Sequence, residues 1–252
     1  MVIYLLEIII GIMIPLFGTM LGSSLVFLLK KNISDNTKKF IMGLSAGVML
    51  AASIWSLIIP AINLSNNNPL PTIIGFVLGM MGLLLINKVL EKRKNVNMLN
   101  LSVIIHNIPE GLSVGVAIAG ALSNNTFVMT SAILLSIGIG LQNIPEGSII
   151  SLNSLSTKSK FKSFIDGILS GVVEPIASII AIVLVIFITP VMPYFLSFAA
   201  GAMIFVCVNE LIPNSEGKMG IIGVTIGFSI MMFLDVVLGW TIKTKKALLR
   251  VH

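Results

Sequence analysis

The sequence predicts an all-α membrane protein that crosses the bilayer eight times. Hydrophobic residues make up 56% of the 252 residues and charged residues only 10%, whereas soluble domains are about one quarter charged. The chain also contains eight separate apolar stretches, each close to the roughly 20 residues that a helix needs to cross about 30 Å of hydrocarbon. The composition therefore argues against a soluble protein and favours a bundle of transmembrane helices.

The eight helices are expected to form one transporter domain over residues 1–252, because the connections between them are too short for a soluble domain. The first stretch follows no basic leader and ends in no small-residue cleavage site, so we expect a retained helix and not a signal peptide. The expected helices span approximately residues 3–29, 40–62, 70–88, 100–122, 127–152, 164–188, 191–213 and 219–242.

Lys and Arg are concentrated in the odd-numbered connections, whereas the second, fourth and sixth connections contain neither residue. Because basic loops stay on the cytoplasmic side, the N-terminus is expected outside. The pI near 9.6 is thus a signal of topology and does not indicate a nucleic-acid partner. Four basic residues after the eighth helix break the pattern, either as a tolerated exception or because one helix is miscounted: Lys243, Lys245, Lys246 and Arg250.

Two sequence similarities relate helices of opposite direction. SAGVMLAASIWSLIIP (45–60) in the second helix resembles AAGAMIFVCVNELIP (199–213) in the seventh, and HNIPEG (106–111) in the fourth returns as QNIPEG (142–147) in the fifth. Small residues can recur merely because they let helices pack closely, but a repeated NIPEG does not follow from packing. The pattern predicts inverted repeats, which in transporters place the substrate site near the bilayer midplane.

Each NIPEG motif puts polar side chains on one face of a helix, because residues three and four apart share a face. The residues are His106, Asn107 and Glu110 in the fourth helix and Gln142, Asn143 and Glu146 in the fifth. Since the two helices are antiparallel, we expect Glu110 and Gln142 to lie at the same depth in the membrane, and His106 and Glu146 likewise. Glu174, in the GVVEP segment of the sixth helix, is expected at the same level.

Three carboxylates inside a bilayer need compensation. An ionised side chain at mid-membrane costs about 2.5–3.5 kcal/mol even on a lenient insertion scale, and no Lys or Arg lies near enough in the spans to neutralise them. Either protons or a bound cation can compensate. Imidazole, carboxylate and amide oxygen without thiolate suit zinc, iron(II), cobalt and manganese. We favour a two-metal site bridged by Glu110 and Glu146, because two dications would balance three negative charges.

Pro109 and Pro145 also favour a polar path. A proline cannot donate to the carbonyl four residues earlier, and a freed carbonyl at membrane depth must find a polar partner or cavity. Gly111 and Gly147, which end the two motifs, leave room for close helix approach.

Simpler roles are open for several polar residues. His106, Gln142 and Asn143 fit interhelical hydrogen bonding as well. Glu210, near the inner end of the seventh helix, fits either an interfacial carboxylate or a metal exit ligand. We expect structural or interfacial roles for Asp166 and Asp235.

At these motifs the sequence resembles the ZIP (Zrt-, Irt-like protein) family of divalent metal transporters, most of all its short bacterial and archaeal members. The resemblance covers nearly the whole chain and includes the EP pair of the sixth helix. It implies import of zinc most of all, and also of iron, manganese, cobalt or cadmium, into the cytoplasm across the cell (plasma) membrane. It further implies that both termini lie outside, that the protein is a homodimer, and that helices one, four, five and six slide as a bundle against the rest.

Carried over by position, the resemblance assigns one metal site to His106, Glu110, Gln142 and Glu146 and a second to Asn107, Glu110, Asn143, Glu146 and Glu174. The metal is then a transported substrate, and no prosthetic group is expected. Two features depart from the family. Residues 89–99 form a short connection without His, where many members have a long His-rich one, and Asn209 precedes Glu210 where many members have His.

Two rival functions use the same carboxylates. A proton-coupled carrier of a small organic cation would use them as proton relays. An intramembrane metalloenzyme would need an open metal position and a general base, but HEXXH is absent and one intramembrane His makes a poor hydrolytic site. An enzyme is therefore not expected.

Overall fold

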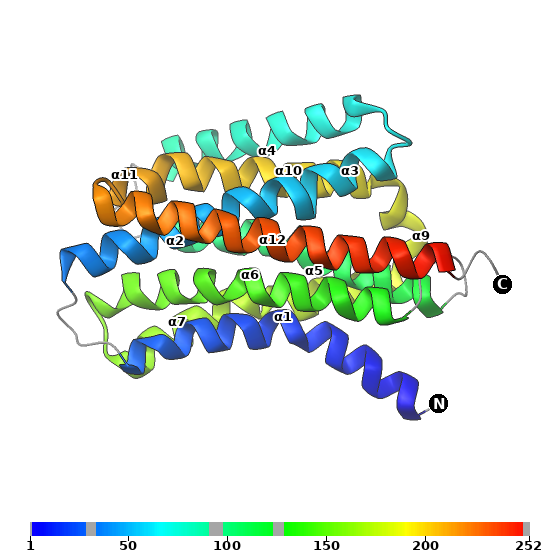
Figure 1. Ribbon diagram of the computed structural model, residues 1–252, viewed down its shortest axis with the longest axis horizontal. Helices are drawn as coiled ribbons and strands as arrows, with labels where there is room; N and C mark the ends of the chain where they lie inside the picture. The colour runs from blue at the N-terminus through cyan, green and yellow to red at the C-terminus, as the bar shows by residue number, and fades with distance from the viewer. Residues whose placement is uncertain (1, 29–33, 91–97, 123–128, 249–252) are drawn as a thin grey trace.

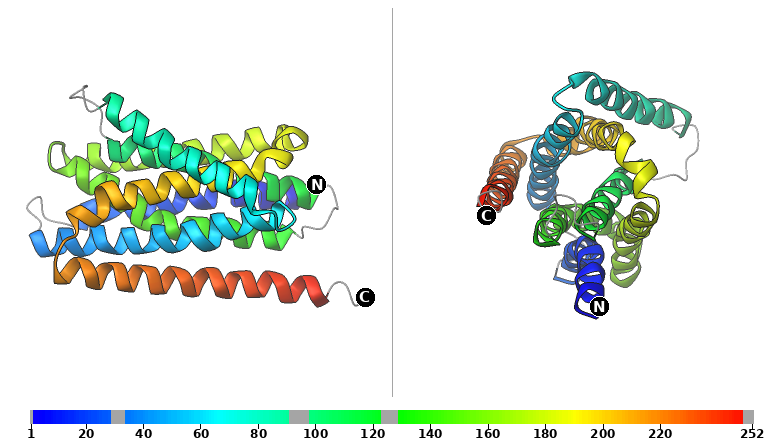
Figure 2. Two further views of the ribbon diagram at one scale, coloured as in Figure 1. Left: turned by 90° about the horizontal axis from the view of Figure 1, so that it is seen from above. Right: turned by 90° about the vertical axis from the view of Figure 1, so that its right-hand side faces the viewer.

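The computed structural model describes residues 2–28, 34–90, 98–122 and 129–248, except for the side chains of residues 2–4, 90, 98–102, 106, 131 and 238–248. These residues form an elongated bundle of helices, and no strand occurs among them (Figures 1 and 2). Eight helical segments within them are long and apolar enough to cross a membrane. The predicted all-α, eight-span fold is confirmed.

Five of the eight spans are single α-helices: α1 (Val2–Leu28), α4 (Pro69–Leu90), α5 (Met98–Leu122), α6 (Met129–Leu155) and α12 (Lys218–Leu248). The second span joins α2 (Asp35–Ala52), the π-helical segment η1 (Ser53–Ile58) and α3 (Ile59–Leu64). The sixth joins α7 (Lys160–Gly171) and α8 (Val173–Val183). The seventh joins α9 (Val185–Ile188), the 3₁₀ turn η2 (Thr189–Val191), α10 (Met192–Val206), the π-helical segment η3 (Cys207–Leu211) and α11 (Ile212–Asn214).

The predicted end of the sixth helix at residue 188 is wrong. Helix α8 ends at Val183, and Leu184 leaves helical geometry with φ −107° and ψ 23°, so α9 belongs to the seventh span. The apolar run continues through this break without a charge or a glycine, and hydropathy therefore gives no sign of it.

The second and sixth spans begin earlier than predicted because their first turns are polar. Ser34 precedes α2 and accepts a hydrogen bond from the backbone N–H of Thr37. Ser159 precedes α7 and accepts one from the backbone N–H of Lys162. Side chains of this kind satisfy N–H groups that have no partner within the helix, so each helix extends beyond its apolar run.

The helices pack in four close pairs, α1 with α6, α5 with α8, α2 with α12 and α4 with α10. Each pair approaches through glycine. A Cβ atom added at Gly18, Gly47, Gly79 or Gly115 would lie only 1.9–2.3 Å from a backbone oxygen of the facing helix. Small residues thus set the helix spacing, as expected where lipid removes the hydrophobic drive for association.

The pairing has the symmetry that the inverted repeats predict. The repeat relates the first span to the sixth, the second to the seventh, the third to the eighth and the fourth to the fifth. Under this exchange the α1–α6 pair becomes the α8–α5 pair. The same exchange turns α2–α12 into α10–α4. Both copies of the repeated segment 45–60 and 199–213 continue into a π-helical segment, of six residues in η1 and five in η3. Their one-residue difference in length therefore falls within the π-helical segments.

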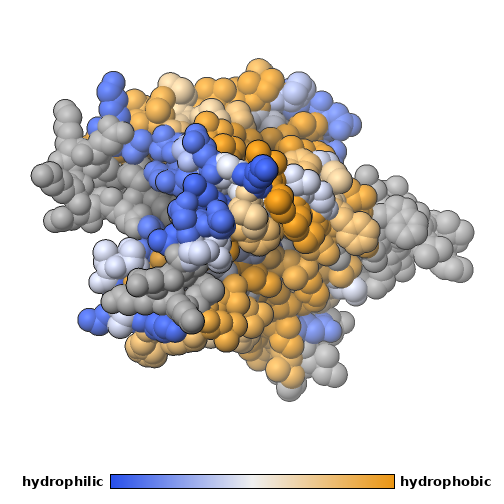
Figure 3. All heavy atoms as spheres, turned by 60° about the vertical axis from the view of Figure 1, so that its left-hand side comes forward, coloured by the Kyte–Doolittle hydropathy of each residue, from blue (hydrophilic) through white to orange (hydrophobic). Residues whose placement is uncertain are grey.

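The two described chain ends lie at the same end of the bundle, and α2, α7 and α12 all begin at the opposite end (Figure 1). Seen with that opposite end brought forward, hydrophilic atoms gather there, while the flank of the bundle is mostly hydrophobic (Figure 3). Chain ends at the same end of the bundle agree with an even number of spans. The hydrophilic atoms at the opposite end agree with a face that lies outside the hydrocarbon of the bilayer.

Gly79→Ala is expected to destabilise the protein by about 1–3 kcal/mol, because the added Cβ would lie 2.0 Å from the Phe198 carbonyl oxygen and the helices must move apart. Gly82→Ala on the same helix is the control, since its nearest neighbour would be the Phe198 ring at an ordinary 3.8 Å. Thermal unfolding in detergent measures both. Equal effects of the two substitutions would contradict this account of the packing.

Candidate metal centre

The predicted ligands with described side chains are all buried in the interior of the bundle. Their exposed fractions are at most 2%, although all six are polar: Asn107, Glu110, Gln142, Asn143, Glu146 and Glu174. His106 lies in α5 directly before Asn107, but its side chain is outside the described part of the chain. Its predicted role and its predicted meeting with Glu146 therefore stay predictions.

Helices α5 and α6 meet through a glutamate and a glutamine. Gln142 Nε2 donates a hydrogen bond to Glu110 Oε1. This contact confirms the prediction that Glu110 and Gln142 lie at the same depth in the antiparallel helices.

Asn143 joins three helices at one point. Its Nδ2 donates to both carboxylate oxygens of Glu174, at 2.9 and 2.8 Å, and to the backbone oxygen of Pro15 in α1 at 3.2 Å. Asn107 Nδ2 donates to the backbone oxygen of Ser170 in α7 at 3.0 Å. We call the six buried residues and these contacts the acidic cluster. It draws together α1, α5, α6, α7 and α8.

The three glutamates of the acidic cluster would repel one another when ionised. Glu110 lies close enough to both Glu146 and Glu174 for this repulsion, and Glu174 lies close enough to Glu146. Amide nitrogens donate to Glu110 and Glu174, but an amide carries no net charge. A favourable state of the cluster thus needs positive charge, supplied either by protons or by a cation.

The acidic cluster also has more acceptors than donors. Four buried oxygens have no hydrogen-bond partner among the described groups: Asn107 Oδ1, Glu110 Oε2, Gln142 Oε1 and Asn143 Oδ1. Buried polar atoms normally find a partner, and oxygens of this kind are ligands for divalent cations. Among the described side chains, no three from His, Cys, Asp and Glu are grouped closely enough to hold a metal ion by themselves. Within the described part of the chain, the oxygens available to a metal at this place are those of the glutamates and of the amides.

Prolines lie in all four spans around the acidic cluster. Pro15, Pro109 and Pro145 lie inside α1, α5 and α6, where each removes a helical hydrogen bond. Pro175 follows Glu174 in the first turn of α8, a position where a helix tolerates proline. Sequence reasoning missed the contributions of α1 and α7 to the site. The interior position of Pro15 was a signal for α1, whereas nothing in the sequence distinguishes the carbonyl of Ser170.

The glycines that end the two motifs bring other helices close to the acidic cluster, as predicted. A Cβ at Gly111 would lie 2.4 Å from the backbone oxygen of Glu174, and one at Gly147 would lie 2.2 Å from that of Thr19. Gly111 therefore lets α5 pack directly against the turn of α8 that carries Glu174.

The three other acidic residues that the sequence analysis singled out each have a polar partner. Asp166 forms an ion pair with Lys158 at 2.6 Å, and Ser56 Oγ donates to Asp235 Oδ1 at 2.6 Å. These contacts fit the structural roles expected for the two aspartates. Glu210 is partly buried on η3 and accepts a hydrogen bond from Asn209 Nδ2 at 3.3 Å.

Comparison with known proteins points to one family. A family described as "ZIP Zinc transporter" matches residues 87–235, which include every predicted ligand. Zinc transporter ZIP11 of Xenopus tropicalis is 29% identical over 330 residues, covering 89% of this chain and 97% of the relative. Zinc transporter ZIPB of Bordetella bronchiseptica is 28% identical over 253 residues, covering 88% and 78%. Human ZIP11 is 35% identical over 151 residues, covering 58% of this chain and only 44% of the human protein.

Asn143→Leu is expected to cost about 1–3 kcal/mol of unfolding free energy, because it leaves buried Glu174 without its amide donor. Asn209→Leu removes the same kind of amide–glutamate contact at an exposed position and should change stability by about 0.5 kcal/mol or less. Denaturation of the two purified variants without metal measures the difference. A loss at Asn143 no larger than at Asn209 would mean that this hydrogen bond does not hold α6 to α8.

Proposed function

Because the chain belongs to the ZIP zinc transporter family, we propose that it carries zinc, together with other divalent metals such as iron, manganese, cobalt or cadmium, across the membrane into the cytoplasm. The observation that carries this proposal is the acidic cluster, in which three mutually repelling glutamates are buried beside unpartnered amide oxygens. A dehydrated dication is the substrate that such a site would stabilise best.

The proposed substrate site is binuclear. One metal would bind His106, Glu110, Gln142 and Glu146, and the other Asn107, Glu110, Asn143, Glu146 and Glu174. Gln142 and Asn143 now direct their nitrogens at carboxylates. Rotation of each amide would turn its oxygen toward a metal and remove a competing donor. Binding would then replace weak amide contacts by stronger metal–oxygen bonds.

The packing supports transport by movement of a bundle. Glycine contacts hold α1 to α6 and α5 to α8 on one side, and α2 to α12 and α4 to α10 on the other. A contact between these two groups is the long hydrogen bond from Ser45 Oγ to the backbone oxygen of Pro145, at 3.4 Å. Helices α1, α5, α6, α7 and α8 carry the acidic cluster and would move as one body.

We further propose a multi-pass protein of the plasma membrane with its N-terminus outside, of the short prokaryotic type and assembled as a homodimer. Basic odd-numbered connections support the orientation, and the short connection at residues 89–99 supports the subtype. In the third and eighth spans only 22% of the apolar stretch that identifies the span is buried inside the bundle. The rest of each stretch is surface that can contact lipid or a second copy.

Glu110→Ala is expected to lower zinc uptake into proteoliposomes by about 10- to 100-fold, because it removes the carboxylate shared by both proposed metals. Glu7→Ala is the matched control, since Glu7 lies in α1 outside the acidic cluster and is partly exposed. Uptake by Glu110→Ala at the wild-type rate would refute the assignment of the site.

Zinc is expected to raise the melting temperature of the wild-type protein, by an amount equivalent to about 2.7 kcal/mol when zinc is present at 100 times its Kd. The effect should weaken as pH falls, because protons compete with metal for the imidazole and the carboxylates. Melting curves at two pH values, each with and without zinc, measure both. A melting temperature indifferent to zinc, but raised by organic cations, would favour a proton-coupled carrier of organic cations.

A further inference from the structure

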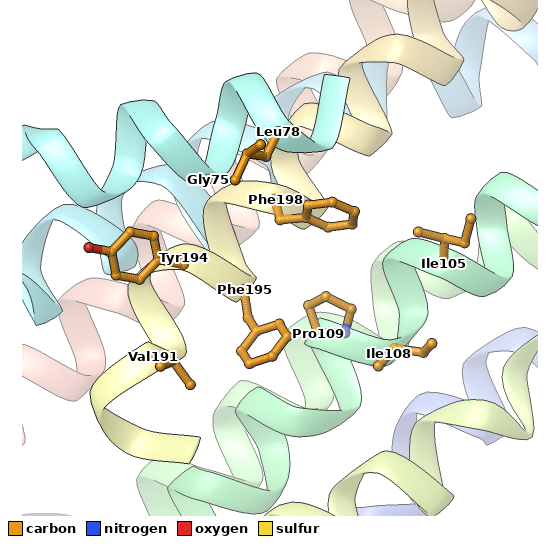
Figure 4. A pocket seen from close by; sticks show the side chains of 9 residues that line it. All are labelled: Gly75, Leu78, Ile105, Ile108, Pro109, Val191, Tyr194, Phe195 and Phe198. Atoms are coloured by element: carbon orange, nitrogen blue, oxygen red, sulfur yellow. The ribbon is translucent and has the colours of Figure 1, made fainter. Parts of the chain in front are cut away.

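An apolar recess opens between α5 and the α4–α10 pair (Figure 4). Its volume is about 410 Å³, which is within the range of small-ligand pockets in proteins. Side chains from three helices project around the same space. The residues that matter here are Leu78 of α4, Ile105, Ile108 and Pro109 of α5, and Phe195 and Phe198 of α10.

The lining of the recess offers an occupant almost nothing but hydrocarbon. Among the described lining residues, only Tyr194 has a polar side-chain group, and its hydroxyl points away from the other lining side chains (Figure 4). An ordered water molecule needs two to four polar partners, so water does not fill this space favourably. The occupant should be apolar.

The recess faces the surroundings of the bundle at membrane depth. Leu78, Ile108 and Phe195 are 58%, 39% and 38% exposed. The lining residues come from within the candidate spans Pro69–Val89, Val103–Leu122 and Val185–Asn214. At this depth the medium is the hydrocarbon of the bilayer.

We propose that the recess binds an acyl chain of a membrane lipid, inserted between α5 and the α4–α10 pair. Lipid chains already surround this surface, so their binding avoids the loss of translational and rotational entropy that accompanies association with a further protein. An acyl chain is also flexible enough to fill a hollow, whereas a second copy would need a projecting side chain that matches it.

The site lies directly behind the acidic cluster. Ile108 and Pro109 line the recess, while their neighbours Asn107 and Glu110 point into the bundle interior. If α5 moves against α4 and α10, as the proposed function requires, the bound chain lies in the interface that slides. Binding itself does not depend on that function, because the six proposed metal ligands with described side chains do not line the recess.

The test uses the wild-type protein in liposomes that contain a trace of phosphatidylcholine with a diazirine near the end of one acyl chain. After illumination, mass spectrometry locates the labelled residues. We expect labelling of residues 105–109 and 195–198 several-fold above that of Ile221 and Phe233 in α12, although these two are more exposed, at 66% and 65%. Leu78→Trp should fill the recess and reduce this labelling several-fold. Leu85→Trp, at a position 60% exposed on the same helix but outside the recess, should not.

Two results would overturn the proposal: labelling that simply follows exposure, or labelling unchanged by Leu78→Trp. Zinc uptake by the same liposomes is measured in parallel. Absent labelling with normal uptake would reject the lipid site alone, whereas specific labelling without uptake would reject the proposed function alone.

Discussion

The structure depends on how a low-dielectric interior tolerates three glutamates. Glu110, Glu146 and Glu174 are buried together and would repel one another when ionised, and burial of like charges without compensation is strongly unfavourable. The surroundings relieve only part of this cost, because Gln142 and Asn143 donate from uncharged amides. A protein that keeps such a cluster inside a membrane must neutralise it with protons or with a cation. The proposed function assigns this neutralisation to a divalent cation that is held in transit.

The NIPEG motif combines several physical roles within five residues. The glutamate faces the acidic cluster, the asparagine holds a neighbouring helix, the proline removes a backbone hydrogen bond and the glycine admits another helix. The two copies make different contacts with the same chemistry. Gly111 admits the backbone of Glu174 in α8, and Gly147 admits that of Thr19 in α1. This agrees with the exchange of spans that relates the helix pairs, and with the π-helical segments that occur in both copies of the other repeat. Interruptions of this kind are frequent at functional sites.

Much of this arrangement could be predicted from side chains alone. Hydropathy identified all eight spans, and helical periodicity placed the proposed ligands on shared faces. The opposite directions of the two NIPEG helices predicted the contact between Glu110 and Gln142. The missed features belong to the backbone. The helix break at Leu184 lies within a uniformly apolar run, and the carbonyl oxygens of Pro15 and Ser170 that hold Asn143 and Asn107 have no side-chain signature. Such acceptors become visible only when helices distant in sequence are placed together.

The central claim is that the acidic cluster holds a divalent cation. Anomalous diffraction at the zinc edge, from crystals grown with zinc, tests it most directly. The account predicts one or two strong peaks within bonding distance of Glu110 and Glu146, with further ligands from Gln142, Asn143 or Glu174. Peaks confined to exposed residues at the ends of the helices, with none among the buried glutamates, would contradict it.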